Sequence, residues 1–386
     1  MKDGESEDFY DKYIHAKRVG QILTAVLVVV AGLFVYGTVT FFTCDELKEQ
    51  HCWLNLRQQH SVEQEKLTHH GGVVENQHNA IGKLNLESAY GDNQPYHPKV
   101  LNFAEAWHGY KYWMTYSPFP NGDEKYENPH IRASNDLIHW EIPEGLKNPI
   151  EDTPENYEES KVYNSDPHIV YNNDTDTMEL FWRYVDDVED IVVIYRKTSK
   201  DGVNWSDKDE ILRATRSKKD YIAPAIIYDN GTYKWWFVDR DRSLKYMESK
   251  DNSEFSKEKS IKLEYAVVPI TNWHLDVIKT DDQYEMLMVG YYKWEDRNSM
   301  NLYYFNSRDG IEWHDGSVVL RPSISSWDNR GIYRSSFIKE NGVYYVFYSG
   351  VATNMERGIG MSYGENIHDL VGSNPDEAPT KSESEE

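Results

Sequence analysis

Asp166-Pro-His-Ile-Val-Tyr171, followed after a turn by Met178-Glu-Leu-Phe-Trp-Arg-Tyr184, sets the pattern of this chain. The first stretch is a short apolar strand signal. The second is an aromatic-rich strand of the kind that suits a pleated, half-buried sheet. The same pair of strand signals occurs five times between residues 97 and 363. Repeats of roughly 50–70 residues with several strands per copy are typical of propeller blades, so the pattern predicts an all-β, five-bladed β-propeller over residues 93–370.

The other four copies keep the same order of strand signals. Their openings are His97-Pro-Lys-Val-Leu-Asn102, Ala223-Pro-Ala-Ile-Ile-Tyr228, Leu275-Asp-Val-Ile-Lys-Thr280 and Arg334-Ser-Ser-Phe-Ile-Lys339. Their second strands are Tyr110-Lys-Tyr-Trp-Met-Thr-Tyr116, Tyr233-Lys-Trp-Trp-Phe-Val238, Tyr284-Glu-Met-Leu-Met-Val-Gly290 and Val343-Tyr-Tyr-Val-Phe-Tyr-Ser349. In a propeller the innermost strand of each blade runs along the central channel, so the openings are expected to point a ring of side chains at one pocket.

A second repeated element marks the outer half of the blades. Its three clear copies are Ser134-Asn-Asp-Leu-Ile-His-Trp140, Ser199-Lys-Asp-Gly-Val-Asn-Trp205 and Ser307-Arg-Asp-Gly-Ile-Glu-Trp313. A degenerate copy occurs at Ser249-Lys-Asp-Asn-Ser-Glu-Phe255. Asp and Gly favour a tight turn between antiparallel strands, and the Trp can pack over that turn. These elements are therefore predicted to be structural and not catalytic.

The N-terminal region predicts a membrane anchor. Residues 22–43 carry no charge and, at about 1.5 Å per residue, would span roughly 33 Å as a helix, enough for a bilayer core. Lys12, Lys17 and Arg18 precede this segment, and Asp45 and Glu46 follow it. The positive-inside rule then predicts a single-pass protein of the cell membrane, with residues 1–21 in the cytoplasm and the propeller outside the cell.

The segments beside the predicted blades are polar. Residues 44–92 are expected to form a stalk and linker, because they are rich in Glu, Gln and Lys and then in Asn, His and Gly. Residues 371–386 are expected to be a disordered acidic tail. The two cysteines, Cys44 and Cys52, both precede the repeats, so no disulfide framework holds the main domain. The formal net charge of −24 argues against nucleic acid as a partner.

These features resemble the five-bladed propeller glycosidases, the group that includes glycoside hydrolase families 43, 32, 68 and 130. The resemblance covers about residues 95–370 and rests on the blade number, the x-Pro openings and the Ser-x-Asp-Gly-x-x-Trp turns. It implies three carboxylates on the inner strands of the first three blades, which act as base, orienting group and acid. The matching positions here are His97, Asp166 and Ala223, so only the second position agrees.

Carboxylates at neighbouring positions can replace the missing two. Glu127 precedes a strand of the first blade in Tyr126-Glu127-Asn128-Pro129, Asp220 lies just before the third blade, and Asp276 opens the fourth inner strand. Each of them can equally be a turn cap. We take Asp166, Glu127 and Asp276 as the candidate catalytic residues.

A second set of residues is expected to bind substrate around the channel. Arg183 and Arg334 are either substrate clamps or members of buried ion pairs with Asp166 or Asp276. Trp273 and His274 resemble a pocket rim. No cofactor or metal is expected, apart from a possible cation on the channel axis near His274. The candidate substrate-binding residues are His97, Asn128, His168, Arg183, Asp220, Tyr221, Trp273, His274, Tyr333 and Arg334.

Two functional classes remain open. The first is a glycosidase that acts on a poly- or oligosaccharide, with Trp107, Trp113, Trp182 and Trp273 either stacking on sugars or packing the blades. The second is a non-catalytic propeller that binds glycans or serves as a surface scaffold. Two pocket carboxylates about 5–10 Å apart across an open channel would favour hydrolysis. Carboxylates held by Arg183 and Arg334 would favour binding.

Overall fold

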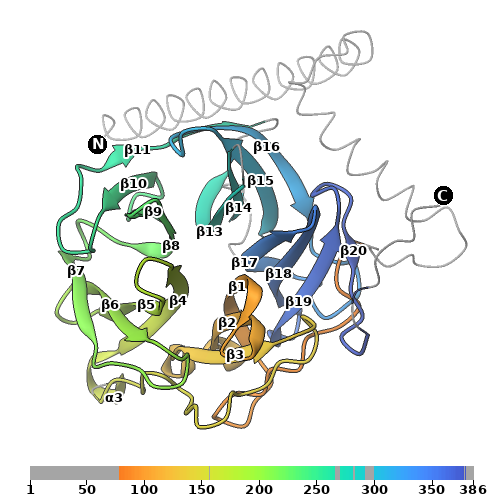
Figure 1. The fold of residues 1–386 in the computed structure, drawn as a ribbon, viewed down its shortest axis with the longest axis horizontal. Helices are drawn as coiled ribbons and strands as arrows, with labels where there is room; N and C mark the ends of the chain where they lie inside the picture. Colours follow the sequence, from red (N-terminus) through yellow and green to blue (C-terminus); the bar gives the residue numbers. More distant parts are fainter. Residues whose placement is uncertain are drawn as a thin grey trace, which may run out of the picture. The chain divides into compact units, whose positions relative to one another are not determined.

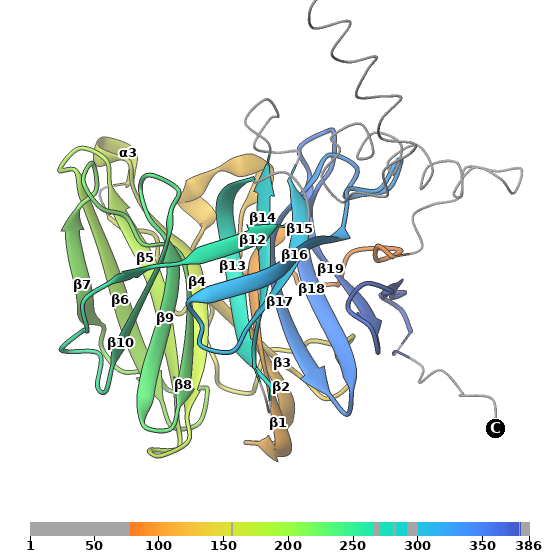
Figure 2. The ribbon, with the colours of Figure 1, turned by 90° about the horizontal axis from the view of Figure 1, so that it is seen from above.

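The computed structural model describes residues 78–377 and 379, except 156, 266–269, 281–282 and 292–299. Five sheets are arranged in a ring around a central channel (Figure 1), and the side view shows their strands standing side by side (Figure 2). The inner strands contact one another in the order β1, β4, β8, β13, β17 and back to β1, which closes the ring. The predicted five-bladed propeller is therefore confirmed.

Each blade is an antiparallel meander, in keeping with the repeated pair of strand signals. The first blade contains β1 (Pro95–Trp107), β2 (Tyr110–Pro118) and β3 (His130–Ser134). The second contains β4 (Val162–Asn172), β5 (Thr177–Asp186), β6 (Ile191–Ser199) and β7 (Asp209–Thr215). The third contains β8 (Ile222–Asp229), β9 (Thr232–Val238), β10 (Leu244–Ser249) and β11 (Lys259–Ser260).

The remaining two blades follow the same plan. The fourth contains β13 (Thr271–Lys279), β14 (Tyr284–Tyr291), β15 (Asn301–Ser307) and β16 (Glu312–Leu320), and β12 (Lys262–Tyr265) pairs with β16 in parallel. The fifth contains β17 (Gly331–Glu340), β18 (Val343–Val351), β19 (Arg357–Gly364) and β20 (Val371–Gly372). Two 3₁₀ turns, η1 (Pro120–Gly122) and η2 (Glu124–Tyr126), and a short helix α3 (Tyr157–Ser160) lie in the loops.

Every inner strand has a bulge near its start, where one extra residue interrupts the pairing with the next strand. In the first three blades the residue before the proline adopts a left-handed backbone, with φ of 52° at His97, 52° at Asp166 and 47° at Ala223. Bulges re-aim side chains, and strained backbone of this kind gathers at functional sites. The x-Pro openings thus mark the level of the channel where the side chains are redirected.

The repeated turns have the structure that their sequence predicts. In the second blade, Gly202 N donates to Ser199 Oγ (2.8 Å), Val203 N donates to Asp201 Oδ1 (2.9 Å), and Trp205 Nε1 donates to Gly202 O (3.2 Å). The same three contacts occur in the turn that begins at Ser307. The serine, aspartate and tryptophan of these repeats therefore close a turn. The prediction that the repeated turns are structural is confirmed.

The boundaries of the propeller differ from those predicted. Of the expected stalk and linker, residues 78–92 are described, and they pack against the fifth and first blades, with Leu84 and Leu86 fully buried and Leu84 N donating to Ile359 O (2.8 Å). Their apolar side chains explain why this part is not a free linker. At the other end, β20 extends two residues into the segment expected to be a tail.

The predicted membrane anchor at residues 22–43 lies outside the described residues, as do residues 1–21 and most of the stalk. Within the part of the chain that the structure describes, no helix is both long and apolar enough to cross a bilayer.

Gly202→Ala is expected to destabilise the propeller by roughly 2–4 kcal/mol. Gly202 has φ of +74°, and a Cβ at this position would overlap the ring of the fully buried Trp113 in the neighbouring blade. Gly109 has φ of +90°, but no atom lies within 4 Å of the place that a Cβ would take, so Gly109→Ala isolates the backbone strain, about 1 kcal/mol. Chemical denaturation of both variants gives the difference. Equal destabilisation would contradict the packing that joins the first two blades.

Candidate active site

Three side chains from three blades meet at the level of the bulges. His97, Asp166 and His274 each offer one ligand atom, and these atoms all lie within 4.8 Å of one another. The three residues are 2–3% exposed. They come from β1, β4 and β13, so only the closed ring of blades brings them together. The sequence predicted all three as site residues, and the structure places them in one cluster.

The hydrogen bonds of the cluster fix the orientation of its side chains. His274 Nδ1 donates to the backbone oxygen of Tyr333 (3.2 Å), and its Nε2 lies 3.5 Å from Asp166 Oδ1. Asp166 Oδ2 accepts from Ala223 N (3.2 Å), and Oδ1 also accepts from Arg334 Nη1 (3.2 Å). A carbonyl oxygen can only accept, so the proton of a neutral His274 is on Nδ1 and the Nε2 lone pair faces the carboxylate.

The pKa values of these groups favour that protonation state. Burial lowers the pKa of His274 to about 3, against the opposing effect of Asp166. Burial also holds the pKa of His97 well below its usual range. Burial alone would raise the pKa of Asp166, but His274 and His97 when protonated, and Arg334 with its permanent charge, lower it below the usual range. At neutral pH the cluster therefore has two neutral imidazoles and one carboxylate, the state in which these groups bind metals.

Glu127 lies beside the cluster. Its Oε1 is 3.4 Å from His97 Nδ1, which also bonds Ser117 Oγ at 2.8 Å. Burial, followed by the charge of Asp166, raises the pKa of Glu127 well above its usual range. A carboxyl group that is protonated more easily than usual, next to a carboxylate that is not, is a common arrangement for proton transfer.

The loop that carries Glu127 is fixed by its neighbour Asn128. The Asn128 side chain donates to Tyr90 Oη (2.7 Å) and Thr153 Oγ1 (2.8 Å), and its oxygen accepts from Asn164 Nδ2 (2.8 Å). Asn128 is fully buried in this network. It was predicted to bind substrate, and the structure gives it the role of positioning the Glu127 loop.

His130 supports the same loop and makes it sensitive to acid. Its Nδ1 donates to Asn128 O (2.8 Å), and its Nε2 accepts from Ala89 N (3.1 Å), so the ring must be neutral. Burial lowers the pKa of His130 from 6.5 to about 4. Because the pKa is lower in the folded state, the contribution of neutral His130 to the free energy of unfolding is complete above pH 6.5 and is lost as the pH falls toward 4. The loss from this group is roughly 3 kcal/mol.

We therefore expect the free energy of unfolding to fall between pH 6.5 and 4, and His130→Gln to make that fall shallower. Gln can still donate and accept but does not titrate. Denaturation series at several pH values would test this. An identical pH slope in the variant would contradict the neutral assignment of His130.

Aromatic rings lie around the two histidines, and those of Tyr333, Trp273 and Phe119 are half-buried whereas that of Tyr96 is fully buried. The ring of Tyr333 is 4.7 Å from that of His274, and the ring of Trp273 is 5.5 Å from it. On the side of His97, the rings of Tyr96 and Phe119 lie at 4.9 and 5.9 Å. Such faces suit the C–H face of a sugar ring. Tyr333 and Trp273 were both predicted to line the pocket.

Several other predicted residues are engaged in structural contacts. Arg183 makes a two-pronged ion pair, as the structural alternative expected, but its partner is Asp220 (2.8 and 2.7 Å) and not Asp166 or Asp276. His168 bonds the backbone of Ile226 between the second and third blades. The ring of Tyr221 packs on that of Phe237 at 5.1 Å.

Asp276 does not join the cluster. Both of its oxygens are held by Lys99 Nζ, at 2.7 and 3.0 Å, and Oδ2 also accepts from Phe337 N (3.3 Å). Its proposed catalytic role therefore has no geometric support, because a carboxylate bound in this way is not free to transfer a proton.

Three residues near the site were missed. Lys99 stands two residues after His97 in the same opening, and a charge in a buried strand should have predicted an acidic partner. Ser117 orients His97 and has no sequence signal of its own. Arg357 is 5% exposed, its Nη1 bonds Met355 O (2.9 Å), and its guanidinium lies 4.6 Å from the centre of the Phe119 ring.

Comparisons with known proteins agree with the fold. No family model matches the chain. A curated relative, the A type blood N-acetyl-alpha-D-galactosamine deacetylase of Flavonifractor plautii, is 29% identical over 321 residues, covering 69% of this chain. The chain spans 41% of that relative's length.

The search of solved structures also finds carbohydrate-active proteins that are similar to this chain. An N-acetylgalactosamine deacetylase from F. plautii, in complex with blood group B trisaccharide, aligns with a TM-score of 0.68 at 24% identity, over 76% of this chain and 97% of that one. A family 43 β-1,3-galactosidase with galactodeoxynojirimycin aligns with a TM-score of 0.51 at 12% identity, over 76% and 97%. The chain thus has the five-bladed propeller fold of these carbohydrate-active proteins and is similar in sequence to the deacetylase.

Proposed function

We propose that this protein is a carbohydrate-active amide hydrolase that removes the acetyl group from an N-acetylated sugar, with a divalent cation bound by His97, Asp166 and His274. The observation that carries the proposal is the contact between His274 Nε2 and Asp166 Oδ1 at 3.5 Å. Two lone pairs face each other there with no proton between them, an unfavourable arrangement that a cation would stabilise.

The donor set fits such a cation. Two imidazoles and one carboxylate are the protein ligands of many catalytic zinc and iron sites, which leave a position open for water or substrate. The Nδ1 protons of metal-binding histidines usually go to a backbone oxygen or carboxylate, as His274 does with Tyr333 O. A cation bound there would polarise the amide oxygen and lower the pKa of a bound water.

The chain's own residues supply the remaining functions. Glu127 can accept the proton that water loses as its oxygen bonds the amide carbon. The same carboxyl can then donate that proton to the nitrogen as the carbon–nitrogen bond breaks, giving acetate and the amino sugar. Arg334 holds Asp166 in place through Oδ1. The rings of Tyr333 and Trp273 are placed to contact the sugar.

A glycosidase mechanism has less support. The third-blade position that would hold the acid is Ala223, and Asp276 is bound to Lys99. Asp166 is held by Arg334, an arrangement that favours binding over glycosidic turnover. Deacetylation needs one proton-transferring carboxyl beside a cation site instead of a free carboxylate pair, and Glu127 lies beside the His97–Asp166–His274 cluster in that way. The similarity to the deacetylase supports the same choice.

We also infer that the protein is anchored in the cell membrane through residues 22–43, with the propeller outside the cell. The support is the uncharged 22-residue segment and the basic residues before it. Fractionation of cells, followed by protease treatment of intact cells, tests this. A propeller that remains protected from protease would contradict it.

The test of function is acetate release by the full chain from an oligosaccharide ending in N-acetyl-α-D-galactosamine, with reducing-end release measured in parallel. Acetate without reducing ends, lost on chelation and restored by a divalent cation, supports the proposal. Reducing ends without acetate would make the protein a glycosidase. Binding without either product would make it a glycan-binding propeller. The same oligosaccharide ending in galactose, which has no amide, is the control.

A further inference from the structure

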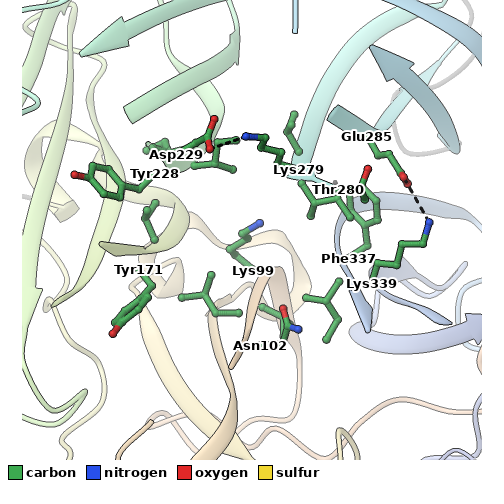
Figure 3. Close-up of a pocket in the computed structure, with 18 of the residues that line it drawn as sticks. Lys99, Asn102, Tyr171, Tyr228, Asp229, Lys279, Thr280, Glu285, Phe337 and Lys339 are labelled. Carbon is green, nitrogen blue, oxygen red and sulfur yellow. Dashed lines mark hydrogen bonds and ion pairs between the residues drawn. The ribbon is translucent and has the colours of Figure 1, made fainter. Parts of the chain in front are cut away.

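Arg357 is a buried cation that makes no ion pair with any residue that the structure describes. It opens β19 in the fifth blade and is 5% exposed. The other buried lysines and arginines of the described residues each have a carboxylate partner, and they are Lys99, Arg183 and Arg334. Lys279 likewise bonds Asp229 (2.7 Å) in the cavity of about 1120 Å³ at the far end of the inner strands (Figure 3). Because burial of an unpaired charge is costly, the place of Arg357 needs another explanation.

The guanidinium of Arg357 packs on the start of the loop that leads from β2 to Glu127. Its Cζ lies 4.6 Å from the centre of the Phe119 ring and 5.5 Å from that of the Tyr96 ring. A cation near the face of an aromatic ring is attracted by the electrons of that ring, and the attraction grows when water is excluded. The rings of Phe119 and Tyr96 therefore take the place of a carboxylate partner.

Gly122 allows this loop to approach the guanidinium closely. A Cβ at Gly122 would lie 2.9 Å from Arg357 Nη2, closer than side chains normally pack. Gly122 has φ of +83°, and Asn121 before it has φ of 55°. Glycine adopts such a left-handed backbone without strain, so it suits both the conformation and the contact at this position.

Gln94 joins the backbone of Arg357 to the same part of the loop. Its Oε1 accepts from Arg357 N (3.1 Å) and from Asn121 N (3.2 Å), and its backbone oxygen accepts from Phe119 N (3.0 Å). Arg357 Nη1 donates to Met355 O (2.9 Å), in the turn between β18 and β19. The fifth blade therefore holds residues 119–122 of the first blade through the side chain and the backbone of Arg357.

Other residues hold the second half of the loop. Asp123 Oδ1 accepts from Tyr157 Oη (2.8 Å) and from Lys125 N (3.0 Å). Asn128 is fixed by its bonds to Tyr90 and Thr153. Glu127 lies between the two supports, five residues beyond Gly122 and directly before Asn128.

We propose that Arg357 is a positioning residue for Glu127, because it holds the start of the loop that carries this carboxyl to the His97–Asp166–His274 cluster. The contact lies where the fifth blade meets the first, with β19 against β1, so the loop is fixed only when the ring of blades is closed. The inference rests on the proposed function for the proton that Glu127 transfers, whereas the contacts that hold the loop do not depend on it.

The test compares Arg357→Met and Arg357→Lys in the full chain, by hydrogen–deuterium exchange and by steady-state acetate release. Arg357→Met removes the charge and the bond to Met355 O, so exchange at residues 119–127 is expected to become faster. We expect kcat to fall about tenfold and KM to change by less than about twofold, because the cluster and the rings beside it stay in place. Arg357→Lys keeps a charge near Phe119 and should recover part of both effects.

The matched control is Arg196→Met. Arg196 is a half-buried arginine of the second blade, and its ion pairs are with Glu179 and Asp209 of the same blade. Its loss should reduce stability without faster exchange at residues 119–127 and without a lower kcat per folded molecule.

The positioning role is overturned if Arg357→Met leaves exchange at residues 119–127 unchanged, or if Arg196→Met raises that exchange equally. It is also overturned if Arg357→Met raises KM and leaves kcat intact, which would make Arg357 a substrate-binding residue. If the unmodified chain releases no acetate, the proposed function fails, and the exchange measurement alone then decides whether Arg357 holds the loop.

Discussion

Asp166→Asn is expected to lower kcat/KM for acetate release by roughly 10³-fold, equivalent to about 4 kcal/mol of transition-state stabilisation. The substitution removes the negative charge of the cluster and places an amide where a ligand oxygen stood, 3.5 Å from His274 Nε2. An uncharged amide binds a divalent cation far less well than a carboxylate. Steady-state kinetics with the N-acetylgalactosamine-terminated oligosaccharide provide the measurement.

The control for this prediction is Asp276→Asn, because the sequence made both aspartates candidate catalytic residues. Asp276 is bound to Lys99 and not to the cluster. Its loss should reduce stability and leave the activity per folded molecule nearly intact. If both substitutions lower kcat/KM equally, or if Asp166→Asn is fully active, the assignment of the site is wrong.

Lys99→Met is expected to destabilise the protein by about 3–5 kcal/mol, because it leaves the carboxylate of Asp276 buried without its counter-ion. The Lys99 and Asp276 side chains are 5% and 2% exposed. Removing both charges in a Lys99→Met/Asp276→Leu variant should recover most of that loss, since two apolar side chains of similar volume can replace a buried pair. Denaturation of the two single variants and the double variant gives the coupling energy.

This cycle also tests the contact between the two side chains. A coupling energy near zero would mean that Lys99 and Asp276 do not face each other across the channel axis.

The fold could be predicted from the sequence because each blade repeats its own local signals. The strand pair at Asp166–Tyr184 and the turn at Ser199–Trp205 both lie within one blade. The two-residue alternation of side chains along a strand and the residues of a tight turn depend on local sequence alone, so both can be predicted. The bulges could also be suspected from the x-Pro openings. The left-handed backbone at His97 and Asp166 could not be predicted in this way. A proline disfavours the helical conformation in the residue before it, but it does not require a positive φ there.

The site could be predicted only in part because its partners come from distant blades. The sequence identifies Asp166 and Asp276 as similar carboxylates at inner-strand openings. Both are ion-paired, Asp166 with Arg334 and Asp276 with Lys99, and which of them also meets the two histidines depends on the register of strands that do not pair with each other. The distinction between a cluster ligand and a structural ion pair therefore needs the closed ring.

The most direct test of the proposed cation site is a crystal structure of the full chain grown with a divalent transition metal, with anomalous data collected at the metal edge. We expect one anomalous peak in contact with His97, Asp166 and His274, and its loss in Asp166→Asn. Cation-free density in which His274 bonds Asp166 directly would contradict the site, and the protein would then be better described as a propeller that binds glycans without hydrolysing them.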